Sequence, residues 1–76
     1  MELELYKNFK KALQFKIEGY YQGRYDISSA QMYGYGIAQG LLLSGKVSEK
    51  DFAWLLAKID EIVSCSIHNK YNNVID

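Results

Sequence analysis

Residues 27–45 read ISSAQMYGYGIAQGLLLSG and carry no charged side chain, although 24% of the residues in the chain are charged. Soluble monomers rarely expose large apolar patches, so this stretch must be covered on most sides by the rest of the chain or by another molecule. It is too polar for a membrane span, because Gln31, Gln39 and several glycines interrupt it before about 18 consecutive apolar residues are reached. We therefore expect a buried segment and no membrane association.

The same stretch carries the signals of one helix. Ser28 is a candidate N-cap, and Gln31 three residues later completes a capping box. Ser44-Gly45 is a typical C-terminal stop. These signals predict a helix over about residues 28–43. Each interior glycine costs such a helix about 1 kcal/mol relative to alanine, so contacts with other elements must hold it.

Two further helices flank this one. Before it, apolar side chains that recur every three or four residues predict a helix over about residues 3–21. After it, Ser48 is an N-cap followed by acidic residues, and an apolar stripe predicts a helix over about residues 48–67. Residues 69–76 are typical of a frayed tail.

The connection between the second and third helices is short, which predicts an antiparallel hairpin with the first helix packed across it. The expected fold is all-α, a small three-helix domain over residues 1–76. The rival interpretation makes strands of residues 20–25 and 33–37, because tyrosine favours sheets, but neither segment has a clear partner strand.

Size and composition exclude several classes of protein. A chain of 76 residues buries only about 60% of the surface that its unfolded form exposes, so association would help its core. Cys65 is the only cysteine, which excludes an intrachain disulfide and a zinc site built on several thiolates. Residues 1–6 lack the basic start and apolar run of a secretory signal. We expect a cytoplasmic protein.

Candidate interface residues lie away from the main apolar stripes. On a helical wheel of residues 28–43, apolar side chains occupy opposite sides, which suggests one neighbour more than two flanking helices supply. Gly36 and Gly40, four residues apart, leave a notch without side chains between these sides. The notch serves either contact with a partner or packing within the chain. Two aromatic residues in the other helices also point away from their stripes. The predicted partner or dimer interface comprises Gly36, Gly40, Tyr35, Leu42, Trp54, Ala53, Ala57 and Phe15.

A tyrosine-rich turn is a possible secondary binding patch. Tyr21, Arg24 and Tyr25 offer rings and a guanidinium for packing within the chain, for protein contacts or for stacking on exposed bases. The lysines of the first helix could extend such a surface. Nine basic and nine acidic side chains cancel, however, so the long-range field that supports nucleic-acid binding is absent.

Residues with catalytic or metal-binding chemistry are sparse. Cys65 and His68 share a helix face with Glu61, but a structural zinc takes four ligands and a nucleophile needs a substrate cleft. We therefore predict no catalytic, cofactor-binding or metal-binding residues.

These observations predict a small non-enzymatic protein-interaction module. It would act as a homodimer, or as an adaptor or inhibitor on a larger protein partner, a type of protein that mobile elements also encode. The alternative is a nucleic-acid-binding protein that uses the tyrosine-rich turn and the lysines of the first helix.

Overall fold

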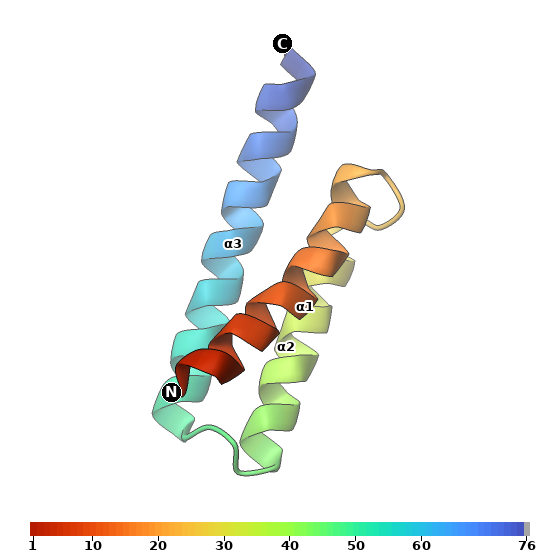
Figure 1. The fold of residues 1–76 in the computed structure, drawn as a ribbon. Helices are drawn as coiled ribbons and strands as arrows, with labels where there is room; N and C mark the ends of the chain where they lie inside the picture. The colour runs from red at the N-terminus through yellow and green to blue at the C-terminus, as the bar shows by residue number, and fades with distance from the viewer. Residues whose placement is uncertain (76) are drawn as a thin grey trace.

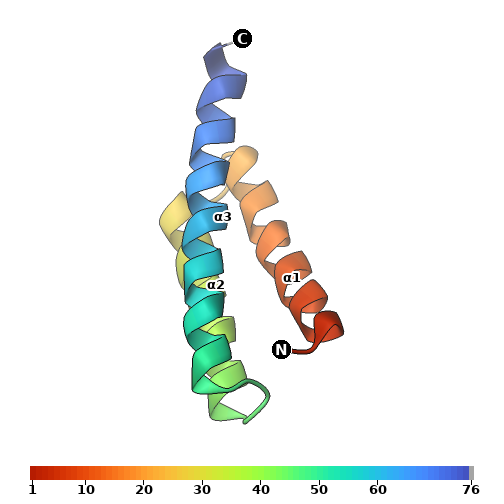
Figure 2. The ribbon, with the colours of Figure 1, turned by 90° about the vertical axis from the view of Figure 1, so that its left-hand side faces the viewer.

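The computed structural model describes the backbone of residues 1–75 and the side chains of residues 1–70, and it contains three α-helices (Figure 1). They are α1 (Leu3–Tyr21), α2 (Ile27–Leu43) and α3 (Glu49–Ile75). α2 and α3 form an antiparallel hairpin and α1 packs across α2, which confirms the predicted all-α arrangement. No strand occurs within residues 1–75. Figure 1 and Figure 2 together show that α1 is inclined to α3.

α1 and α2 end in the same glycine motif. At the end of α2, the Gly45 and Lys46 amides donate to the Leu42 and Leu41 carbonyls at 3.1 and 2.9 Å. Gly45 has a φ of +75°, a conformation that only glycine adopts without cost. The predicted stop at Ser44-Gly45 is confirmed as a Schellman motif. Gly23, with a φ of +79°, ends α1 in the same way.

The N-cap of α2 differs from the prediction. The Asp26 carboxylate accepts hydrogen bonds from both the amide and the hydroxyl of Ser29, each 2.9 Å long, so the helix begins at Ile27. The expectation that Ser28 caps this helix is wrong, because Ser28 already lies in the first turn. Ser48 does cap α3 as predicted, since its hydroxyl accepts the Asp51 amide at 3.1 Å.

α3 continues beyond its predicted end near residue 67. Residues 69–75 are helical, so the expected frayed tail is wrong for them, and Asp76 lies outside the described residues. Nothing in this segment is a glycine or proline that would end a helix. The Lys70 ammonium donates to the Tyr20 carbonyl at 2.9 Å and lies 4.2 Å above the Tyr20 ring. This contact ties the C-terminal half of α3 to the end of α1.

The core is built from large side chains of α1 and α3 around small residues of α2. Leu13 of α1 and Ile59 of α3 are fully buried. A Cβ atom added at Gly34 would lie 3.2 Å from side-chain atoms of both. α2 also contributes Ala30 and Ala38, so it is the thin middle helix on which the other two pack.

Each apolar side of α2 has a neighbour within the chain. On one side, Ile37 and Leu41 line a shallow apolar hollow together with Leu5 and Phe9 of α1. On the other side, Tyr35 is hydrogen-bonded to Asp60 of α3. The additional neighbour expected for α2 is therefore not needed on these two sides.

Over the residues that the structure describes, no helix combines the length and the apolar character required to cross a bilayer.

Candidate functional site

The predicted interface residues lie on several different surfaces. Phe15 is 68% exposed on the outer side of α1, and Trp54 lies on the side of α3 that faces α1. Tyr35 and Leu42 are half-buried and pack against the core. Ala53 and Ala57 are exposed on α3, and Gly36 and Gly40 are exposed on α2.

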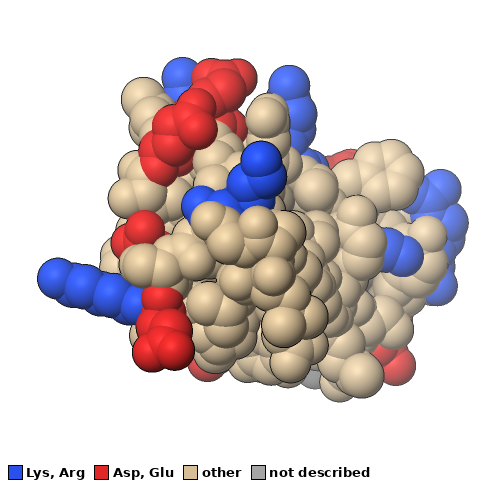
Figure 3. Space-filling model, turned by 90° about the horizontal axis from the view of Figure 1, so that it is seen from below, with Lys and Arg blue, Asp and Glu red and all other residues tan. Residues whose placement is uncertain are grey.

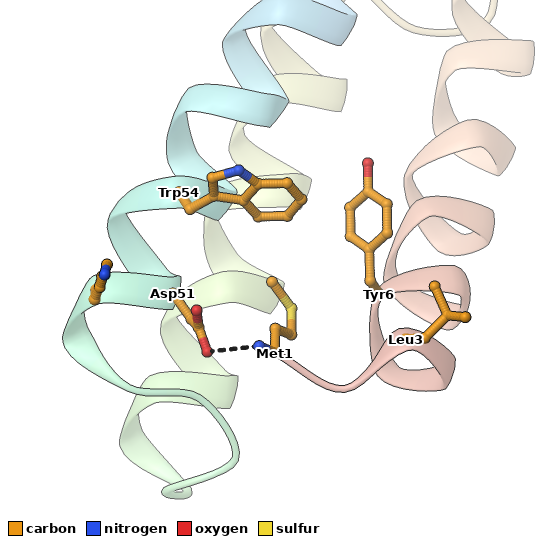
Figure 4. A pocket seen from close by; sticks show the side chains of 6 residues that line it. Met1, Leu3, Tyr6, Asp51 and Trp54 are labelled. Carbon is orange, nitrogen blue, oxygen red and sulfur yellow. Dashed lines mark ion pairs between the residues drawn. The ribbon is translucent and has the colours of Figure 1, made fainter.

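Trp54 forms the wall of an open cleft between the N-terminal ends of α1 and α3 (Figure 4). Its ring lies 5.1 Å from the Tyr6 ring in an edge-to-face arrangement, which is a favourable aromatic geometry. Trp54 as a whole is nevertheless 43% exposed. The cleft measures about 330 Å³ and is lined by Met1, Leu3, Tyr6, Lys50, Asp51 and Trp54.

Charged groups around this cleft are of both signs. The Asp51 carboxylate lies 3.3 Å from the Met1 ammonium. The Lys58 ammonium lies 5.6 Å from the centre of the Trp54 ring and 3.3 Å from the Glu61 carboxylate. The cleft therefore combines apolar walls with a rim that carries no strong net charge.

A second cleft lies between the same two helices, nearer their other ends. It measures about 410 Å³, and Ile17 and Tyr21 of α1 face Ile62 and Cys65 of α3 across it. Trp54 and Cys65 are separated by roughly 16 Å along the axis of α3. We call the surface between α1 and α3, on which both clefts lie, the α1–α3 groove. It exists because α1 and α3 both pack on α2 and make few close contacts with each other.

The tyrosine-rich turn is largely used for packing within the chain. The Tyr25 ring covers Gly19, and the Lys16 ammonium lies 4.2 Å above it. The Lys70 ammonium covers the Tyr20 ring. Of the predicted patch, Tyr21 and Arg24 are exposed and Tyr25 is half-buried. The area left for stacking on bases is therefore smaller than the sequence suggests.

The cysteine on α3 faces solvent at the edge of the groove. Cys65 is exposed and unpaired, and Glu61, one turn earlier, forms its ion pair with Lys58. Among the described residues, no group of three histidine, cysteine or acidic side chains is arranged to hold a metal ion.

Sequence reasoning missed the α1 side of the Trp54 cleft. Tyr6 belongs to the apolar stripe of the first helix, so periodicity assigns it to the core, and it is half-buried. Leu3 is 66% exposed beside it. The off-stripe position of Trp54 was a usable signal, but a helical wheel gives no information about the neighbour that a side chain meets.

Comparison of the chain with protein-family models, with curated proteins and with solved structures finds no match.

Proposed function

We propose that this chain is a small protein-interaction module that binds an amphipathic helix of a larger protein partner in the α1–α3 groove. A large apolar side chain of that helix would sit against Trp54. The observation that carries the proposal is the 43% exposure of Trp54 beside an open apolar cleft. Tryptophan is enriched among the residues that dominate binding energy at protein interfaces.

The shape of the groove favours a helix as the occupant. α1 and α3 both pack on α2. A four-helix bundle has a fourth helix packed against two such helices, and that position is open here. The two clefts are roughly 16 Å apart, or about three helical turns. A single amphipathic helix could therefore place one apolar anchor in each cleft, which is the usual mode of helix-in-groove recognition.

The charges around the groove favour a protein over a nucleic acid. Lys58 is paired with Glu61 beside Trp54, and Asp51 lies at the other edge of the cleft. In the view from below, basic and acidic side chains are scattered, and neither sign forms a continuous patch (Figure 3). Nucleic-acid affinity depends mainly on concentrated positive charge.

Photocrosslinking in an extract of the native cell tests the proposal. A photoreactive amino acid replaces Lys50 at the edge of the cleft, and a matched control carries it at Ser64, which is exposed on α3 outside both clefts. We expect an adduct at position 50 but not at 64. Its crosslinked peptide should be a helix with apolar residues at three- and four-residue spacing. Equal adducts at both positions would contradict the proposal.

Two variants connect the adduct with the cleft. Trp54→Ala should weaken capture by about 30-fold or more, the usual loss at a dominant interface residue. Leu3→Lys adds a charge at a residue that lines the cleft and is 66% exposed, so it should reduce capture without disturbing the core. Circular dichroism establishes that both variants fold. Undiminished capture by two folded variants would exclude the groove as the binding site.

A further inference from the structure

One strip of α2 has no neighbour within the chain. Met32 is 70% exposed and Leu43 is 84% exposed. Between them lie Gly36 and Gly40, where an added Cβ atom would meet nothing within 4 Å. We call these four residues the outer strip of α2. It is uncharged, as is every residue from 27 to 45.

We propose that the outer strip of α2 binds the same strip of a second copy of this chain, with the two helices antiparallel about a two-fold axis. The order of side-chain sizes along the strip is large, small, small, large. Antiparallel pairing about the midpoint of Gly36 and Gly40 places Gly36 of one copy opposite Gly40 of the other. The same register brings Met32 close to Leu43 of the second copy.

This near-symmetric order of side-chain sizes favours a second copy of the chain as the occupant. In an isologous contact the same patch serves both subunits, so a patch must be complementary to itself. The bare glycine segments let the two backbones approach closely, and the two large apolar side chains cover the ends of that approach. An uncharged strip meets itself without repulsion between like charges, and antiparallel helices also oppose their macrodipoles favourably.

The proposed dimer is independent of the α1–α3 groove. None of the four strip residues lines either cleft of that groove. A dimer built on α2 would therefore leave both grooves open and would present two of them to a bivalent partner. Failure of the dimer would not affect the proposed helix-binding function, and the reverse also holds.

Sedimentation equilibrium from low to high micromolar concentration tests the dimer. Gly36→Gln adds a bulky polar side chain where the chain itself leaves open space, so the monomer should fold while dimerisation weakens by about tenfold or more. Met32→Lys should act in the same direction. Phe15→Gln is the matched control, because it removes an exposed apolar side chain from α1 and should leave the dimer unchanged. A wild-type monomer at every concentration, or a dimer that both α2 variants retain, would overturn the proposal.

Disulfide crosslinking tests the orientation. In a Cys65→Ser background, Met32→Cys and Leu43→Cys proteins should crosslink to each other when they are mixed. Neither should crosslink to itself, because antiparallel pairing separates the like positions by roughly 15 to 18 Å along the helix axis, well beyond the Cα separation of a disulfide. Self-crosslinking of each variant without the mixed product would indicate parallel packing and would overturn the proposed arrangement.

Discussion

The Tyr35 hydroxyl of α2 donates a hydrogen bond to the Asp60 carboxylate of α3. The Gln31 amide also donates to both groups, at 3.1 Å in each case, so three polar side chains connect the two helices at the edge of the core. The hydrogen bond to Asp60 raises the pKa of Tyr35, because ionisation would remove the donated proton and place a phenolate beside a carboxylate. This contact gives the hairpin a polar element in an otherwise apolar interface.

Tyr35→Phe should lower the free energy of unfolding by about 1 kcal/mol at neutral pH, because the ring stays in place and the hydrogen bond is lost. Because folding raises the pKa of Tyr35, the hydrogen bond stabilises the protein fully when the pH is below the ordinary tyrosine pKa of 10.0. This stabilisation is lost as the pH rises through the folded-state pKa. The difference between the wild type and Tyr35→Phe should therefore narrow at alkaline pH. Urea denaturation at both pH values measures it, with Tyr33→Phe as the control. A difference that does not vary with pH would contradict this assignment.

The glycines of α2 should respond to substitution with opposite signs. Gly34→Val should destabilise the chain by about 1–3 kcal/mol, because the new side chain would overpack against Leu13 and Ile59. Gly36→Ala enters open space and should stabilise the monomer by about 1 kcal/mol through helix propensity. Thermal denaturation, at a concentration at which sedimentation shows a monomer, measures both changes. Equal effects at the two positions would show that the core does not depend on the small size of residue 34.

The ends of the helices were predictable where the signal was local. Gly45 ends α2 and Ser48 begins α3 because each acts on backbone groups within a few residues of itself. Asp26 was missed because Ser28 offers the same type of cap two residues later, and only the structure shows that Asp26 accepts the Ser29 amide. The extent of α3 was missed because Lys70 meets Tyr20, a contact between residues far apart in the sequence.

The candidate site depended on information that periodicity does not contain. The helical wheel of α2 correctly showed apolar residues on opposite sides, but it could not assign α1 to Ile37 and α3 to Tyr35. Gly34 and Gly36 look alike in sequence, yet one is buried against Leu13 and the other is exposed. Sequence reasoning therefore found that α2 is central and that Trp54 is unusual, while the surfaces on which they lie required the tertiary arrangement.

Acid should weaken the N-cap of α2. The hydrogen bonds from Ser29 lower the pKa of Asp26 below its ordinary value of 3.8, so the cap stabilises the fold above that value and is lost as the pH falls through the folded-state pKa. Asp26→Ala should lower the unfolding temperature at neutral pH, and the difference from the wild type should shrink in acid, below pH 3.8. Asp26→Asn is the control, because its amide oxygen can cap without titrating. An Asp26→Ala difference that is the same at both pH values would contradict a charged cap.

The contact between Gly19 and the Tyr25 ring gives the sharpest test of the packing at the first turn. A Cβ atom at Gly19 would run into that ring, so Gly19→Ala must displace it and should cost about 1–3 kcal/mol, although alanine is the better helix former. In a Tyr25→Ala background the obstruction is gone, and the same substitution should stabilise the chain by about 1 kcal/mol. Denaturation of the wild type, both single variants and the double variant completes a double-mutant cycle. The Lys16 ammonium also lies over the Tyr25 ring. Tyr25→Phe keeps the ring and this contact, so in its background Gly19→Ala should still be destabilising. If Gly19→Ala costs the same with and without the ring, Tyr25 does not pack on α1 in solution and its ring is free for other contacts.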